Sequence, residues 1–313
     1  MPLEAAGRLV RGEVVVLGSP HRCQGDFGVK FTSGGFADVS HVTASFIEGR
    51  IKSAAIVRQP FPHIYVPNIL PSELYASMLA SLPSESQWSE ADPIAPHFNV
   101  IGTGATPQIL LDHARLWTEN YGGYIDLINR LLSERFADDI DGLLTRYRKL
   151  GLIDGPRALF TGQSLFCLRP SGWEIRPHSH NINELVQSLI YFPLPESPAT
   201  LGTTLYKVTR HTKVERKNMN RDLPYAPHSV ERVQKTRYEP NALFSFLNSP
   251  MAVHAAEGTA SMPDRRYIFT KVIKPVESLD HKRGSLSTKA FDTNSLSLFQ
   301  SARRWWAAAA KLP

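Results

Sequence analysis

The spacing of apolar residues changes along the chain, with the change near residues 155–156. In the first half, apolar residues recur three and four positions apart, which is the period of one face of an α-helix. The pattern predicts a strand at 61–66, a helix that Pro71 opens, and helices near 108–119, 124–135 and 138–149. The last of these is the most regular, because its apolar face follows i, i+3, i+4 and i+7 through Ile140, Leu143, Leu144 and Tyr147.

The second half carries short apolar runs separated by turn residues, without helical stretches between them. A polar loop is expected at 209–229. Short strands that follow one another in this way are typical of an antiparallel barrel or sandwich. The chain is therefore predicted to be α+β, with helices first and strands at 158–160, 164–168, 189–192, 202–207, 241–246, 252–255 and 266–273.

The two ends of the chain have weaker patterns than the middle. Residues 1–57 are predicted to be an N-terminal extension with short strands, the first at 14–17. Residues 58–275 form the predicted main domain. After Pro275 the chain turns polar and rich in serine, and a C-terminal tail over 276–313 is expected to end in a short helix near 301–307.

Composition and charge narrow the class of protein. The chain has 313 residues, 42% of them hydrophobic, and a formal net charge of +6. The basic residues occur in small separate groups, so we expect no nucleic-acid face, which would need a concentrated basic patch. No apolar run reaches the roughly 18 residues of a membrane helix. The two cysteines, Cys23 and Cys167, form no disulfide framework, so the sequence predicts a cytoplasmic protein without a membrane segment.

Two histidines beside a predicted strand are the main candidates for chemistry. His178 and His180 are two positions apart, so in a strand both side chains point to the same face and can converge on one ion. Neutral imidazole is a common ligand of Fe, Zn, Cu and Ni. His254, which follows a predicted strand and turn, is the best third ligand. His63, at the start of a strand, is expected to be structural.

A pair of arginines opens the last predicted strand. A guanidinium that reaches into a barrel binds a carboxylate through two hydrogen bonds. Because adjacent strand residues face opposite ways, at most one of Arg265 and Arg266 is expected to point inward.

These features occur in an order that resembles the Fe(II)/2-oxoglutarate-dependent dioxygenase superfamily, including its bacterial members. The resemblance covers about residues 58–275. It rests on ordered short motifs, the first around Phe61-Pro62-His63 and Leu70-Pro71. The later ones are Pro177-His178-Ser179-His180, Leu189-Ile190-Tyr191-Phe192, Gly202-Thr203-Thr204-Leu205-Tyr206, Pro240 to Phe246, His254 and Arg266-Tyr267-Ile268.

The resemblance implies a fold, an activity and a ligand set. The fold would be a double-stranded β-helix, a jelly-roll, cupin-like barrel with supporting helices. The activity would be hydroxylation, with Fe(II) on His178, His180 and His254 and with 2-oxoglutarate as cosubstrate. Arg266 would grip the far carboxylate of 2-oxoglutarate, with Arg265 as the alternative. Tyr206 and Asn241 are further candidates for the lining of the cosubstrate pocket.

One position departs from the family pattern. The family has His-x-Asp or His-x-Glu, and here the second residue is His180. The run from Gly172 through His180 to Glu184 also fits the first half of a cupin motif. Three interpretations remain open: a 2-oxoglutarate oxygenase, a cupin-like three-histidine dioxygenase that does not use 2-oxoglutarate, and an inactive barrel kept as a binding module. The expected partner is a small-molecule or peptidyl substrate, and the basic stretch 207–221 favours an anionic one.

Overall fold

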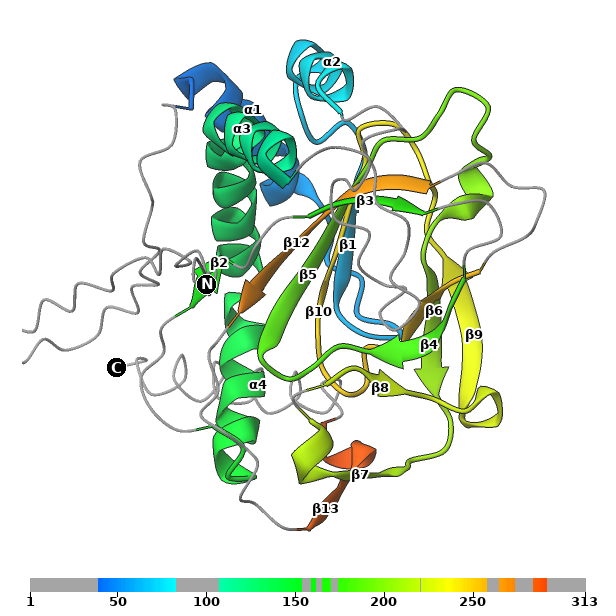
Figure 1. Ribbon diagram of the computed structural model, residues 1–313. Coiled ribbons are helices and arrows are strands. Elements are labelled where there is room, and N and C mark those ends of the chain that lie inside the picture. The colour runs from blue at the N-terminus through cyan, green and yellow to red at the C-terminus, as the bar shows by residue number, and fades with distance from the viewer. Residues whose placement is uncertain are drawn as a thin grey trace, which may run out of the picture.

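The computed structural model describes residues 39–82, 107–153, 159–161, 165–169, 174–219, 221–257, 265–273 and 284–291. These residues form two antiparallel sheets with helices on one side (Figure 1). The mixed α+β composition with antiparallel strands is as the sequence predicted. The predicted strand at 14–17 and the predicted helix near 301–307 lie outside the described residues. The helices are α1 (His41–Ser53), α2 (Ser72–Ala80), α3 (Pro107–Arg135) and α4 (Ala137–Lys149).

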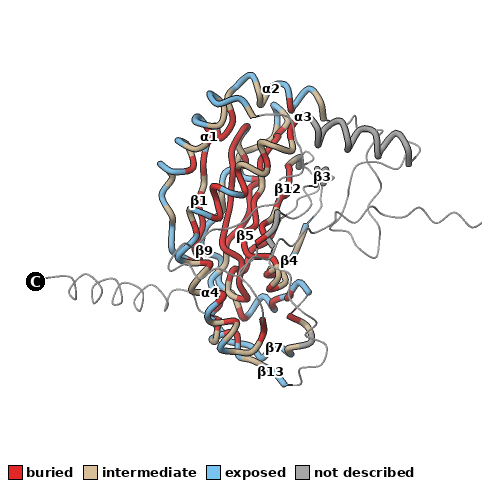
Figure 2. Tube along the Cα trace, turned by 90° about the vertical axis from the view of Figure 1, so that its left-hand side faces the viewer, coloured by how far each residue is buried: buried red, intermediate tan, exposed pale blue. Residues whose placement is uncertain are grey.

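The larger sheet has six strands in the order β1-β10-β5-β12-β2, and β3 also pairs with β12. Its strands are β1 (His63–Val66), β2 (Phe160–Thr161), β3 (Leu165–Arg169), β5 (Glu184–Tyr191), β10 (Leu243–Leu247) and β12 (Arg265–Ile273). Strand β5 is buried along nearly its whole length, because the second sheet covers one face and helices cover the other. Figure 2 shows the resulting band of buried residues through β1, β5 and β12.

The smaller sheet has five strands in the order β8-β4-β11-β6-β9. A separate pair joins β7 (Lys213–Glu215), which lies in the predicted polar loop 209–229, to β13 (Ser285–Ser287), which lies in the predicted C-terminal tail. The strands of the five-stranded sheet are β4 (Ile175–Ser179), β6 (Thr204–Val208), β8 (Leu223–Pro224), β9 (Val230–Lys235) and β11 (His254–Ala256).

Helix α3 is one continuous helix where the sequence predicted two. Gly122 and Gly123 lie between the two predicted helices, and each glycine costs about 1 kcal/mol relative to alanine inside a helix. The buried stripe nevertheless continues on both sides of them, from Tyr121 to Ile125 and Ile128. Burial of that shared stripe offsets the cost of the glycines. On its inner side Asn129 Nδ2 donates to Thr270 Oγ1 of β12 at 2.8 Å, which fixes the helix on the sheet.

Two segments that the sequence placed outside the 58–275 domain pack into its core. Residues 41–53 form helix α1 rather than short strands, and Ile47 and Ile51 are fully buried beside α3. At the other end Phe291 is buried and meets Tyr147 of α4 edge to face, with 5.9 Å between ring centroids. Helix α4 itself matches its prediction, with all four residues of its apolar face buried.

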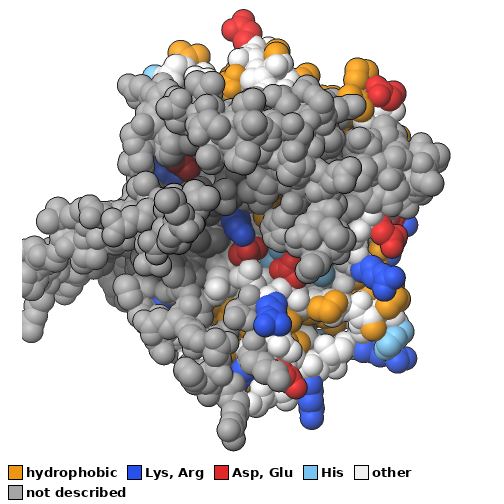
Figure 3. All heavy atoms as spheres, viewed as in Figure 1, with side chains coloured by type: hydrophobic (Ala, Val, Ile, Leu, Met, Phe, Trp, Pro, Cys, Tyr) orange, Lys and Arg blue, Asp and Glu red, His pale blue; other side chains and the backbone are white. Residues whose placement is uncertain are grey.

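Among the described helices, none combines the length and the apolar character needed to cross a membrane. Acidic and basic side chains of the described residues are interspersed on the face shown in Figure 3.

Asn241 holds the entry to strand β10 in place. Its φ of 57° lies in the left-handed region, which Asn tolerates better than most residues. Its side chain accepts a hydrogen bond from the Leu70 amide (3.0 Å) and donates one to the Leu70 carbonyl (2.7 Å). The sequence had proposed Asn241 as a pocket residue, but these contacts commit the side chain to the chain segment before α2.

His63 joins the edges of the two sheets. Its Nδ1 bonds to the Phe61 carbonyl at 2.8 Å, and its Nε2 lies 2.8 Å from the Gln234 amide nitrogen of β9. Both ring nitrogens are thereby engaged with the protein, which agrees with the structural role predicted for this histidine. Burial lowers the pKa of His63, although the bond to the Phe61 carbonyl opposes the shift.

The role of Asn241 can be tested by its effect on stability. Replacing Asn241 with Ala removes two buried hydrogen bonds and leaves a β-carbon in the left-handed region, so the free energy of unfolding should fall by about 2–4 kcal/mol. Asn241→Gly, which keeps the backbone conformation available, should cost less. Urea unfolding measures both. An Ala variant as stable as the parent would contradict this role.

The burial of His63 predicts a pH dependence of stability. Because its folded-state pKa is lowered, the neutral ring stabilises the fold above the unfolded-state pKa of about 6.5, and this contribution is lost as the pH falls through the folded-state pKa. The difference in unfolding free energy between the parent and His63→Gln should therefore shrink as the pH is lowered below about 6.5. A difference that stays constant in urea titrations across this pH range would count against a buried neutral ring.

Candidate metal centre

The pairing of β4 with β11 brings two histidines from distant parts of the chain together. The strands are antiparallel, and His178 of β4 lies directly opposite His254, the first residue of β11. Side chains directly opposite each other in an antiparallel pair have β-carbons about 4.5–5.5 Å apart. The two imidazole centroids are 4.4 Å apart, and both residues are buried.

His180 completes the group from the residue just after β4. Its side chain follows His178 at a spacing of two, so it stays on the same face of the sheet, as predicted. One ring nitrogen from each of the three histidines lies within 4.8 Å of the others. The sequence prediction that His178, His180 and His254 converge is confirmed.

Backbone carbonyls orient two of the three rings. Nδ1 of His178 lies 2.9 Å from the Arg176 carbonyl, and Nδ1 of His254 lies 3.0 Å from the Ala252 carbonyl. A carbonyl only accepts hydrogen bonds, so each Nδ1 carries the hydrogen and each Nε2 keeps its lone pair. In both cases the bond closes back on the residue two positions earlier, so the strand itself sets the direction of the ring.

Burial and neighbouring rings keep His254 neutral. Burial is the main cause that holds the pKa of His254 well below its usual value, and the two neighbouring histidines lower it further. A neutral imidazole is the form that binds metal ions. At neutral pH His254 therefore offers a lone pair rather than a positive charge.

The environment of His180 differs from that of the other two histidines. Its Nε2 lies 3.2 Å from Nε2 of His254, and its Nδ1 lies 3.4 Å from a carboxylate oxygen of Glu184. A second carboxylate, that of Asp222, is 3.5 Å from the same Nδ1. Glu184 thus stands behind the imidazole and outside the three-histidine group.

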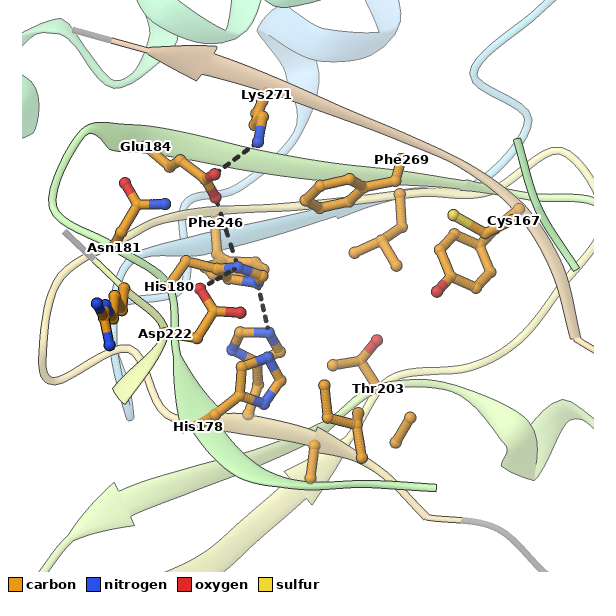
Figure 4. Close-up of a pocket in the computed structure, with 17 residues that line it drawn as sticks. Cys167, His178, His180, Asn181, Glu184, Thr203, Asp222, Phe246, Phe269 and Lys271 are labelled. Atoms are coloured by element: carbon orange, nitrogen blue, oxygen red, sulfur yellow. Dashed lines mark hydrogen bonds and ion pairs between the residues drawn. The ribbon is translucent and has the colours of Figure 1, made fainter. Parts of the chain in front are cut away.

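Aromatic rings and the two sheets enclose this group. The ring of Phe269 stacks on His180, and Phe246 packs against His254 with 4.7 Å between centroids. The cavity beside the histidines has a volume of about 290 Å³ and lies between the sheets (Figure 4). Its wall is mainly apolar, and its charged lining residues are Glu184, Arg221, Asp222 and Lys271.

A buried asparagine that was not among the predicted site residues fixes the loop that carries His180. Asn248, at the end of β10, directs its Nδ2 toward the carbonyls of His180 (3.3 Å), Asn181 (2.8 Å) and Glu184 (2.7 Å). Its own amide donates to the Leu185 carbonyl. The only signal in the sequence was its position in the turn before His254.

The other predicted site residues are not part of this cluster. Tyr206 directs its hydroxyl toward Glu257 at 3.3 Å, and Asn241 pairs with Leu70. Neither borders the cavity. Arg265 and Arg266 begin β12, as predicted, but their side chains lie outside the described residues.

The three histidines fit a divalent transition-metal ion. Two nitrogens bound to one ion at about 2.0–2.1 Å are roughly 3 Å apart when their bonds are near a right angle. The Nε2 atoms of His180 and His254 are 3.2 Å apart, and all three rings present lone pairs to one region. Imidazole suits Fe, Zn, Cu and Ni.

Comparison with known proteins gave only distant matches. A scan against protein-family models and a search of curated proteins gave no match. A solved prolyl-4-hydroxylase from Pseudomonas putida has 15% identity and a TM-score of 0.34, and covers 76% of this chain and 98% of its own. An oxidoreductase of the 2OG-Fe(II) oxygenase family from Burkholderia pseudomallei has 9% identity and a TM-score of 0.36, and covers 80% and 98%. These superpositions are loose, so the function proposed below rests on the residues of the site.

Metal binding should depend on each of the three histidines. Single substitutions of His178, His180 or His254 by Ala remove one of three converging lone pairs, and we expect each to abolish stoichiometric binding of Fe(II) or Co(II). Anaerobic calorimetric titration measures this directly. His228→Ala, at an exposed histidine outside the group, is the control and should bind as the parent does. A variant with all three histidines replaced by Ala that still binds one ion per chain would show that the ion binds elsewhere.

Proposed function

We propose that this chain is a non-haem iron oxygenase that hydroxylates its substrate with 2-oxoglutarate as cosubstrate. The observation that carries the proposal is the convergence of His178, His180 and His254 on one point at the wall of an internal cavity. Closed structural metal sites use four protein ligands, whereas sites that do chemistry leave positions open. Among the described residues three ligands converge, which leaves room for a cosubstrate.

The winding of the strands supports the fold that this function implies. We propose that the two sheets are the halves of a double-stranded β-helix, the jelly-roll form of a β-sandwich. Strands β3, β4, β5 and β6 alternate between the two sheets, and so do β10, β11 and β12. The histidines would then lie on the inner face of the barrel, where the cavity is.

Each element of the site has a task in this reaction. The bound iron would supply the oxygen activation that side chains cannot provide. The Arg176 and Ala252 carbonyls keep two imidazoles in the orientation that ligation needs. Phe246 and Phe269 cover the histidines and exclude water from them.

The cosubstrate carboxylate would pair with an arginine of β12. Tyr267, Phe269 and Lys271 all line the cavity, whereas Thr270 bonds to helix α3 on the other face. Because alternate strand residues share a face, position 265 is on the strand face of the cavity-lining residues and position 266 is on the face of Thr270. We therefore propose Arg265 as the partner of 2-oxoglutarate, ahead of Arg266, which the family resemblance favoured.

The cavity also bears on the hydroxylated substrate. At about 290 Å³ it is near the lower limit of ligand pockets, so it would admit a small molecule or one side chain of a peptide beside the cosubstrate. Arg221, from the basic stretch 207–221, borders the cavity and would favour an anionic group on that substrate.

The function is tested by succinate formation from 2-oxoglutarate in the presence of Fe(II) and oxygen, measured by mass spectrometry. Arg265→Ala should raise the 2-oxoglutarate concentration needed for half-maximal turnover by about tenfold or more, because a charge-assisted pair is worth about 1.5–3 kcal/mol. Arg266→Ala is the matched control and should change it much less. A protein that binds iron yet forms no succinate would refute the 2-oxoglutarate-dependent reaction, and equal effects of the two variants would refute the choice of Arg265.

A further inference from the structure

We propose, resting on the metal centre proposed above, that Glu184 is a positioning residue for His180. It places a fixed negative charge behind the imidazole and so supplies, through the ring, the charge that a coordinating carboxylate would supply directly.

The imidazole of His180 separates Glu184 from the other ligands. Oε2 of Glu184 faces Nδ1 at 3.4 Å, while Nε2 on the opposite side of the ring faces His254 at 3.2 Å (Figure 4). Nδ1 of His180 lies on the side of the ring toward Glu184 and Nε2 on the side toward His254, so an ion held by the three rings would bind Nε2. Glu184 therefore acts on the ion through His180.

Two polar contacts hold the carboxylate in this arrangement. Oε1 of Glu184 pairs with Lys271 Nζ, and Oε2 accepts from Gln187 Nε2, each at 2.5 Å. The Glu184 side chain is buried, with 9% of its surface exposed. Together with the Asn248 contacts to the same loop, these partners hold the carboxylate behind His180.

The charges nearest Nδ1 of His180 are carboxylates, although the cavity wall as a whole carries two acidic and two basic side chains, Glu184, Asp222, Arg221 and Lys271. Two carboxylates, Glu184 and Asp222, lie near Nδ1 of His180, and one ammonium, Lys271, pairs with Glu184. Carboxylates behind a ligating histidine raise the basicity of the ring and tighten metal binding. Asp222 contributes less because 40% of its side-chain surface is exposed and water screens it. A carboxylate at position 180 would instead add a third negative charge here, which gives a physical reason for the histidine.

Lys271 makes the charge effect distinguishable from a structural one. If Glu184 acts by its charge, removing Lys271 leaves its negative charge uncompensated behind His180. A bound divalent cation is then attracted more strongly. Lys271→Met should then keep or tighten metal binding. If the Glu184–Lys271 pair only stabilises the pocket, removing either partner should weaken metal binding alike.

The test measures Co(II) binding, by visible ligand-field bands and by competition with a chelator. Glu184→Gln should bind Co(II) about 10–100-fold more weakly than the parent, with shifted bands. Asp222→Asn should weaken it a few-fold and tests the same effect if Glu184→Gln does not fold. Glu257→Gln is the control. Glu257 pairs with Lys235 at 3.0 Å, and in the described contacts it touches none of the three histidines, so this variant should bind Co(II) as the parent does.

Several outcomes would overturn the inference. Parent-like affinity and spectrum in Glu184→Gln would do so, and so would equal weakening by Glu184→Gln and Lys271→Met. A parent that binds no Co(II) would remove the metal centre and the inference together. A parent that binds Co(II), with the expected effect of Glu184→Gln but without succinate formation, would support the inference and remove only the proposed reaction.

Discussion

The antiparallel pairing of β4 with β11 is the constraint on which the site depends. It places His178 opposite His254, which lies 76 positions later in the chain, and the register sets both rings on the face that borders the cavity. A shift of one residue in this register would turn one ring to the outer face, because strand side chains alternate. The carbonyl contacts at Arg176 and Ala252 then fix the ring direction within that register.

The charges around His180 depend on a second constraint, which is the pairing of β5 with β12 in the larger sheet. Strand β12 brings Lys271 to Glu184, and the register of β12 with β5 places the two residues near each other. The cavity wall is otherwise mainly apolar, so these few charges act in a weakly screened environment. The ring of Phe269 on the same strand stacks on His180. Strand β12 thus supplies both Lys271, which pairs with Glu184, and Phe269, which stacks on His180.

Much of the site could be predicted from local sequence. The spacing of two between His178 and His180 predicts a shared face in any strand, and the period of helix α4 predicts its buried face. Other features depend on partners that are distant in sequence. Gly122 and Gly123 lie between two predicted helices, and burial against the sheet makes α3 continuous across them. Asn241 and Asn248 are ordinary polar residues in turns until their backbone partners are known.

By itself the sequence determined the α+β composition, the three candidate ligands and the absence of a carboxylate at position 180. These follow from local periodicity and from residue identity, which need no knowledge of contacts. Only the tertiary structure decided that Glu184 and Asp222 stand behind His180, that Lys271 pairs with Glu184, and that Tyr206 and Asn241 bond elsewhere. The reason is that strand register and the packing of two sheets set the distances between these charges. The local sequence around each residue does not show which distant residue it will contact.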